Sequence, residues 1–437
     1  MKRRRAAITG IGLVTPVGND VATAWPALIA GKSGGARIAQ FDASGFTTQI
    51  AAEVKNFDVA KAVGDRKLLK FASRAHGFAL AAAAEAMYDA GIAPTGATAN
   101  RWGIAVGTGM MGVPYADLKA VHDHSAASGE LEPTRLIDDP SANDPMVFCR
   151  SQSAAGLSLL ARRYGIRGYA TSVHTACASG GQAAGTALKL IRRGIADCVL
   201  TGGFDSMVNP VGLSGFCLLS AVSPDNDHPE RASRPFDATR NGFLLGEGAG
   251  FLVLEEWEAA RARGAHIYAE LAGDGNSLSS YRITDSPPDG DGPIQAMQQA
   301  LADAGMTIAD IDYINAHGTS TPMNDRSEAA AILRVFGAEC ARIGVSSTKS
   351  TMGHLIAAAG ACEAAICALA IRDGTLPVNA NLEVVDAECT HLNLVQGAPR
   401  RQRVRAALSN SFGFGGSNSC VVFRHPEETD ALIAAGR

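Results

Sequence analysis

Aromatic side chains are scarce in this 437-residue chain, at 6% of all residues, and charged residues make up only 19%. Hydrophobic residues reach 46%, and 48 positions are glycine. A chain with this much apolar surface and this little charge is not disordered. The composition predicts helices that pack closely against sheets through small residues. The length suffices for two domain-sized cores or for one large duplicated body.

Long apolar runs are also missing, since no stretch reaches the ~18 uninterrupted residues that a membrane span needs. Residues 354–371 come nearest, but they include His354 and Glu363, and their alanine and glycine content predicts a core helix. No apolar segment of the secretory type follows the first residues. We therefore expect neither a secretory signal nor a membrane partner.

The charge and the cysteines exclude further classes of protein. A net charge of −4 gives no basic excess for binding nucleic acid. The nine cysteines are odd in number and contain no C-x-x-C pair. In a chain of this length they indicate reduced thiols in a reducing compartment. We expect a cytoplasmic globular protein.

Residues 170–194 place a cysteine where a strand meets a helix. The β-leaning run 170–173 precedes Cys177, and a helix of small residues follows and ends at Gly194. Unpaired backbone N–H groups and the helix dipole favour an anion at such a position. This context predicts a nucleophilic thiolate with a pKa below the usual ~8.5. The alternative is a buried, unreactive cysteine.

Two pairs of segments recur in the same order along the chain. Residues 86–109 read A-M-Y-D-A-G, a strand and G-T-G, and residues 300–319 read A-L-A-D-A-G, a strand and H-G-T. The helices after Cys177 and His354 end in I-R-R-G and I-R-D-G. The order predicts an internal duplication, with chance similarity of alanine-rich helices as the alternative. In a duplicated fold, Cys177 and His354 would begin equivalent helices and face one centre.

Three further stretches have the character of a site: residues 315–328, 346–355 and 409–418. His317 and His354 each follow a strand-like run in a turn of small residues, which is typical of catalytic groups at strand ends. The other histidines lie in ordinary helix or loop contexts. We predict no metal site, even at the H-x-H pair of residues 122–124.

Together these stretches resemble the β-ketoacyl-acyl-carrier-protein synthases, the type I/II condensing enzymes of the thiolase superfamily. The resemblance rests on T-A-C-A-S-G, G-E-G-A-G, A-H-G-T-S-T-P, S-S-T-K-S-x-x-G-H and S-F-G-F-G-G-S-N, in this order between residues 8 and 423. It implies the α/β thiolase fold, two duplicated halves in five layers (αβαβα). We expect the halves at residues 1–264 and 265–425.

The resemblance also implies catalytic roles. Cys177 would hold the acyl group as a thioester, with the backbone N–H groups of Cys177 and Phe414 as the oxyanion hole. His317 and His354, as neutral imidazoles, would bind the malonyl thioester carbonyl and promote loss of CO2. Lys349 would pair with Glu328 and hold the histidines in place.

Substrate contacts follow from the same resemblance. Thr319 and Thr321, and with them Thr284, would bind the phosphopantetheine arm of an acyl carrier protein. Four further side chains would shape the acyl pocket, with Phe414 also as its gate: Phe412, Phe414, Met110 and Phe216. No cofactor is expected beyond the phosphopantetheine on the carrier. The family implies a homodimer with sheets that continue across the interface, or a heterodimer with a ketosynthase-like subunit.

Three departures from the family concern the acyl pocket and its surroundings. His174 replaces a small or acidic residue and is expected to pack below the site, Arg282 stands where histidine is common, and Met110-Met111 differs from housekeeping enzymes. Fatty-acid elongation and a polyketide or polyene pathway therefore both stay open. Two alternatives remain: a non-elongating partner subunit of the chain-length-factor type, and a cysteine-dependent acyl hydrolase.

Overall fold

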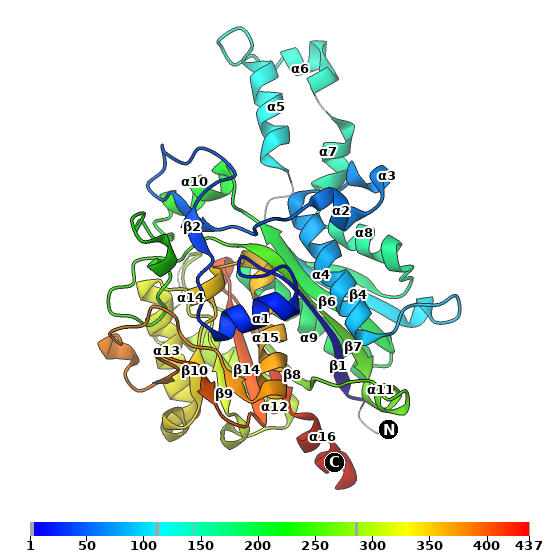
Figure 1. Cartoon of the computed structure of the whole chain (residues 1–437), viewed down its shortest axis with the longest axis vertical. Coiled ribbons are helices and arrows are strands. Elements are labelled where there is room, and N and C mark those ends of the chain that lie inside the picture. The colour runs from blue at the N-terminus through cyan, green and yellow to red at the C-terminus, as the bar shows by residue number, and fades with distance from the viewer. Residues whose placement is uncertain (1–3, 110–112, 143, 285–286, 437) are drawn as a thin grey trace.

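The computed structural model describes residues 4–109, 113–142, 144–284 and 287–436 (Figure 1). Eleven strands of these residues form one sheet in the order β12-β10-β9-β14-β15-β8-β1-β7-β6-β4-β5. The strands are β1 (Ala6–Val14), β4 (Trp102–Thr108), β5 (Ala170–Val173), β6 (Cys198–Ser206), β7 (Glu247–Glu256), β8 (Ala269–Leu278), β9 (Tyr313–Asn315), β10 (Gly344–Ser346), β12 (Asn393–Leu394), β14 (Ala406–Phe412) and β15 (Ser417–Arg424). Two small ribbons pair β2 (Gly35–Arg37) with β3 (Ile50–Ala52) and β11 (Thr375–Leu376) with β13 (Arg400–Arg401).

The sheet consists of two halves with one topology. In β1-β7-β6-β4-β5, successive pairs are antiparallel, antiparallel, parallel and parallel. In β8-β15-β14-β9-β10 the same four directions recur in the same order. The halves are joined through only three Cα pairs between β1 and β8. The predicted internal duplication is confirmed; the domain boundaries at residues 1–264 and 265–425 stay a prediction.

Helices complete a five-layered body. α4 (Arg74–Ala90) covers β1 and β7 and packs against α8 (Ala155–Tyr164), while α12 (Asp291–Ala304) covers β8 and β15 and packs against α13 (Pro322–Phe336). Between the half-sheets, α9 (Ser179–Arg192) and α15 (Ala359–Asp373) contact each other and both halves. The predicted αβαβα arrangement of the thiolase fold is confirmed.

Small residues allow the layers to approach closely. A Cβ added at Gly12 of β1 would lie 1.9 Å from the backbone oxygen of Ala82 in α4. In the middle layer, a Cβ at Gly180 would lie 2.6 Å from the backbone nitrogen of Ala361, so α9 and α15 cross where neither has bulk. The small residues that follow Cys177 therefore accommodate another helix of the same chain. All residues from 359 to 371 of α15 are buried, which confirms the predicted core helix.

Two long regions outside the layers, residues 110–150 and 204–246, contain short helices in their described parts. The described part of residues 110–150 forms α5 (Tyr115–Ser125), α6 (Arg135–Asp138) and α7 (Pro145–Arg150), an arm that projects beyond the layered body (Figure 1). Residues 204–246 include α10 (Pro210–Leu218). The remaining helices are α1 (Val21–Ile29), α2 (Val59–Val63), α3 (Arg66–Leu69), α11 (Trp257–Ala262), α14 (Lys349–Met352) and α16 (Pro426–Ala434). Among the described helices, none has the length and apolar character of a membrane span.

Candidate active site

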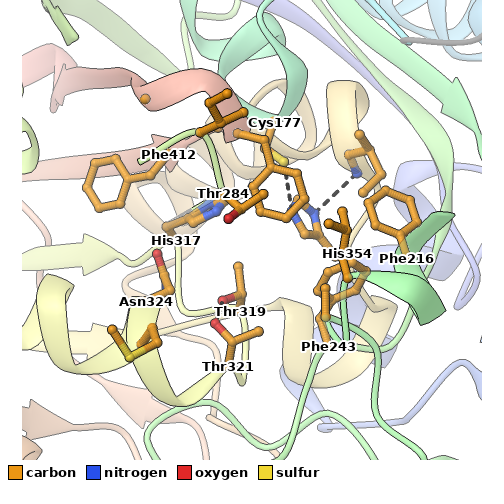
Figure 2. A pocket seen from close by; sticks show the side chains of 18 of the residues that line it. Cys177, Phe216, Phe243, Thr284, His317, Thr319, Thr321, Asn324, His354 and Phe412 are labelled. Carbon is orange, nitrogen blue, oxygen red and sulfur yellow. Dashed lines mark hydrogen bonds between the residues drawn. The ribbon is translucent and has the colours of Figure 1, made fainter. Parts of the chain in front are cut away.

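Cys177, His317 and His354 meet at one point in the interior (Figure 2). The Nε2 atom of His354 lies 3.1 Å from the Cys177 Sγ, and one side-chain donor atom from each of the three residues lies within 4.8 Å of the others. All three residues are buried and line one cavity of about 220 Å³. A thiol and two imidazoles could also ligate a zinc ion; that the reaction needs no metal stays a prediction.

Cys177 lies in a short 3-10 turn, Ala176–Ala178, between β5 and α9. The expected low thiol pKa is wrong. Burial raises the pKa of Cys177 to about 12, and it outweighs the Lys349 ammonium and the backbone N–H groups of Phe414 and Cys177, which act in the other direction. The resting Cys177 side chain is therefore a neutral thiol.

Local backbone geometry sets the tautomer of His354. Its Nδ1 accepts a hydrogen bond of 3.2 Å from the Ile356 N–H, so the ring proton is on Nε2, which faces Cys177. Burial, and secondarily the Lys349 ammonium, hold the pKa of His354 well below its usual value. The imidazole is neutral and presents an N–H to the cavity.

The duplication does not relate Cys177 to His354, contrary to our expectation. The 3-10 turn before α9 has a left-handed residue at Ala176 (φ 50°), and the turn before α15 has one at Ile356 (φ 48°). When the two turns are aligned at these residues, Cys177 is equivalent to Ala357 and His174 is equivalent to His354. Since His174 is exposed, the prediction that it packs below the site is also wrong.

His317 follows β9, and Glu328 of α13 determines the turn that carries it. The fully buried Glu328 carboxylate accepts hydrogen bonds from the backbone N–H groups of His317 (2.8 Å) and Gly318 (2.7 Å). Burial lowers the pKa of His317 well below its usual value, with Lys349 and His354 acting in the same direction. His317 is therefore a second neutral imidazole, and its ring centroid lies 5.4 Å from that of His354.

The predicted pairing of Lys349 with Glu328 is wrong. The Lys349 Nζ lies 2.5 Å from a carboxylate oxygen of Glu363 in α15, and neither side chain is exposed. Glu328 instead bonds to backbone N–H groups and to the Asn410 side chain. One sequence signal identifies Glu363, which is the only acidic residue among the buried positions of an otherwise apolar helix. A buried carboxylate of this kind requires a cation or several donors.

The glycine-rich turn 413–416 brings a second backbone strand to the thiol. Gly413 approaches the nucleophile turn so closely that an added Cβ would lie 3.2 Å from the Cys177 nitrogen. Phe414 follows, and its backbone N–H group and that of Cys177 are close enough to the Cys177 thiol to favour its charged form and so act to lower its pKa. Two backbone N–H groups therefore converge beside the thiol, in the arrangement that an oxyanion hole requires.

The predicted substrate residues, with one exception, line the same cavity: Thr284, Thr319, Thr321, Phe412 and Phe216. The Thr319 and Thr321 hydroxyls share a hydrogen bond of 2.8 Å, and Thr284 is exposed at the cavity. Met110 lies outside the described residues. Phe243 was not expected from the sequence, yet its ring packs edge-on to His354 at 5.2 Å. It lies in an irregular segment without a motif, so only the folded chain identifies it.

Comparison with known proteins agrees with this geometry. Residues 3–260 match the N-terminal domain model of β-ketoacyl synthases, and residues 268–383 match the C-terminal domain model. The chain belongs to the β-ketoacyl synthase family. As members of this family are, it is an acyltransferase of the condensing type. The family fold explains why the nucleophile and the two histidines come from different halves.

Its relatives span the whole chain. It is 41% identical to 3-oxoacyl-[acyl-carrier-protein] synthase 2 of Coxiella burnetii and 39% identical to that of Synechocystis, with 97% of this chain and 99% of each relative covered. Similar solved structures include a type II polyketide ketosynthase bound to its acyl carrier protein and the ishigamide ketosynthase/chain length factor. Each has a TM-score of 0.86 over 97% of this chain and 99% of the other, at 32% and 35% identity.

Proposed function

We propose that this β-ketoacyl synthase condenses an acyl group held on Cys177 with malonyl-acyl carrier protein, with loss of CO2. One observation supports the proposal above all: a buried thiol, two converging N–H groups and two neutral imidazoles surround a single cavity. The set supplies a nucleophile, a site for one oxyanion and donors for another, which is what a two-step condensation requires.

In the first step, the Cys177 sulfur attacks the thioester carbonyl of an acyl carrier protein. The N–H groups of Cys177 and Phe414 hold the oxygen as it becomes negative. The bond to the carrier's phosphopantetheine sulfur breaks, and the thiol proton leaves with that sulfur. The acyl chain then extends along the apolar wall of Phe216, Phe243 and Ile356.

In the second step, malonyl-carrier protein occupies the vacated channel. The His354 Nε2–H and the His317 imidazole donate hydrogen bonds to its thioester carbonyl and stabilise the enolate that forms as CO2 leaves. The enolate carbon attacks the Cys177 thioester, the C–S bond breaks, and the sulfur takes up a proton. Neutral imidazoles suit this step because each can donate without carrying a charge into the cavity.

The partner is an acyl carrier protein, and the phosphopantetheine on it is the only prosthetic group needed. Thr284, Thr319 and Thr321 line the cavity and offer hydroxyl groups for the amide-rich arm. Neither alternative uses the whole site: a chain-length-factor-type subunit does not need the Cys177 thiol, and a cysteine hydrolase has no role for His317. The acyl chains retained on enzyme from its host would identify the pathway.

Separate assays of the two steps test the mechanism. We expect Cys177→Ala to lose acyl loading, and Cys177→Gln, which mimics the acylated thiol, to release CO2 faster from malonyl-carrier protein without forming the condensed product. His317→Ala or His354→Ala should lose decarboxylation and keep loading, measured as the intact mass of the acyl-enzyme. A Cys177→Gln variant that releases no CO2 would refute the proposal.

We further infer that a second copy, or a ketosynthase-like subunit, pairs with β5. This strand ends the order of the large sheet and leaves an edge of unpaired backbone, with the flanking Tyr169 47% exposed. Sedimentation velocity of the chain alone should give twice the 45.1-kDa mass. Tyr169→Arg should shift the population toward monomer, while Tyr88→Arg, at an 89% exposed position on α4, should not.

A further inference from the structure

The mechanism leaves one buried carboxylate beside the nucleophile unused. Asp205, near the end of β6, is 3% exposed. One oxygen accepts the Ala357 N–H at 3.1 Å, and the other accepts the Ser206 N–H at 2.8 Å. Burial raises the pKa of Asp205 to about 7. A carboxylate is costly to bury, so its presence here calls for a structural reason.

The duplication supplies that reason. The repeat aligns Gly107 with His317. In this alignment, Ala105 of β4 is equivalent to Asn315 of β9. Their partners across the sheet are Thr201 of β6 and Ser409 of β14. Thr201 is therefore equivalent to Ser409. Four and five residues further along, Asp205 is equivalent to Gly413 and Ser206 to Phe414.

The two N–H groups that Asp205 binds are therefore the counterparts of the oxyanion hole. Ala357 corresponds to Cys177, and Ser206 corresponds to Phe414. Gly413 has no side chain, so the N–H groups of Cys177 and Phe414 are left facing the substrate cavity. At the equivalent position, the Asp205 carboxylate occupies the N–H groups of Ala357 and Ser206. Gly109 leaves room for it, because a Cβ there would lie 2.3 Å from the carboxylate.

The contact to Ala357 has a consequence for His354. Ile356, between them, has φ of 48°, a conformation that β-branched residues rarely adopt. Such a residue persists only where its surroundings fix it. The Ile356 N–H bonds to His354 Nδ1, and the next N–H along the chain bonds to Asp205. The carboxylate thus holds the peptide group next to the one whose N–H bonds to His354 Nδ1 and so directs the Nε2–H at the thiol.

We propose that Asp205 is a positioning residue for His354: its carboxylate fills the counterpart of the oxyanion hole, formed by the Ala357 and Ser206 N–H groups, and fixes the strained turn at Ile356. The inference rests on the role proposed above for His354 in decarboxylation. It assigns a task in the reaction to the one of the two equivalent N–H pairs that does not face the substrate.

Asp205→Asn tests the proposal, because the asparagine amide has one acceptor oxygen where the carboxylate has two. It therefore cannot accept hydrogen bonds from the Ala357 and Ser206 N–H groups as the carboxylate does. We expect CO2 release from malonyl-carrier protein to fall roughly 10- to 100-fold, the scale of a small misplacement of a catalytic group. Acyl loading of Cys177 should stay near the wild-type rate, since the N–H groups of Cys177 and Phe414 are unchanged. As a control, Asp274→Asn removes another buried carboxylate, which lies on β8 and pairs with Lys189 of α9. It should lower the melting temperature and affect acyl loading and decarboxylation to the same extent.

Equal losses of loading and decarboxylation in Asp205→Asn, in proportion to its melting temperature, would overturn the proposal. If that variant does not fold, Ile356→Gly serves instead, since it frees the fixed turn and should slow CO2 release from malonyl-carrier protein, a rate measured without an acyl chain against the Ile356 wall; a wild-type rate of CO2 release would count against the idea. In the double variant Asp205→Asn/Ile356→Gly, the rate of CO2 release should fall by less than the product of the two single-variant fold losses. His354→Ala separates the failures: retained decarboxylation there would refute the proposed function itself, not the role of Asp205 alone.

Discussion

Cys177, His317 and His354 share an environment in which burial favours the uncharged form of each side chain. The pKa of the thiol is raised and those of both imidazoles are lowered, so the resting site has no thiolate–imidazolium pair. Next to them, the oppositely charged groups of Lys349 and Glu363 pair with each other, and neither side chain is exposed. In the proposed mechanism, the two neutral imidazoles donate hydrogen bonds, and the Cys177 thiol is a nucleophile that is uncharged at rest.

The Lys349–Glu363 pair gives a stability prediction. Lys349→Met should lower the free energy of unfolding by about 3–5 kcal/mol, because it leaves a buried carboxylate without its cation. The double variant Lys349→Met/Glu363→Leu should recover most of that loss, since no charge remains buried. Urea unfolding measures both. Lys119→Met, which removes an exposed pair with Asp123, should leave the unfolding midpoint nearly unchanged; an equally small effect at Lys349 would contradict the prediction.

Among the elements, the turn between β14 and β15 lies against the Cys177 turn and lines the cavity. Gly413 lies against the Thr175–Ala178 backbone, whereas Gly415, with φ of 83°, has no described atom within 4 Å of an added Cβ. The two glycines are needed for different reasons: Gly413 for close approach, and Gly415 for its left-handed backbone. The same turn presents the Phe414 N–H to the cavity, so its spacing determines whether the oxyanion hole exists.

Substitution of these glycines should separate the two requirements. Gly413→Ala would place a methyl group 2.7 Å from the Thr175 oxygen and push the turn away from Cys177. We expect it to lose most acyl loading, measured by intact mass. Gly415→Ala should cost about 1–2 kcal/mol of stability through its positive φ and retain loading. Normal loading in Gly413→Ala would show that the N–H pair is not required.

The whole molecule buries two kinds of titratable group: carboxyl groups whose pKa is raised, and histidines whose pKa is lowered. Asp205 and Glu328 have pKa values raised to about 7 by burial. Those of His76, His317 and His354 are lowered, His76 to about 4, also chiefly by burial. Each set couples the folding equilibrium to pH, with opposite sign.

The melting temperature should therefore pass through a maximum near about pH 6.5. The raised carboxylates bind protons more tightly in the folded state, so the stability they contribute is lost as pH rises from about 4 to about 7, the last part of it above the pH range in which the histidines titrate. The buried histidines bind protons less tightly when folded, so their contribution is lost as pH falls below about 6.5. Thermal unfolding between about pH 5 and 8.5 checks this. Glu328→Gln should flatten the alkaline side, whereas exposed Glu427→Gln should not; a monotonic profile would contradict the account.

Much of the fold follows from local pattern. The alanine-rich run at residues 74–90, rich in helix-forming residues, forms a helix that is capped by Ser73 and ended by Gly91 in the left-handed region. The strand 170–173 and the order of the duplicated segments were likewise predictable, because spacing and turn residues act over short range. The arm at residues 110–150 was not, since its short helices have weak periodicity and depend on contacts made elsewhere.

The candidate reactive residues could be proposed from local pattern, because Cys177, His317 and His354 each lie in a motif of small residues after a strand. Their ionisation states and partners depend on how the chain packs. Burial reverses the expected ionisation of Cys177 and makes both histidines neutral. Proximity across the middle layer pairs Lys349 with Glu363 instead of Glu328. Desolvation and through-space distance are properties of the packed chain, and no local pattern encodes them.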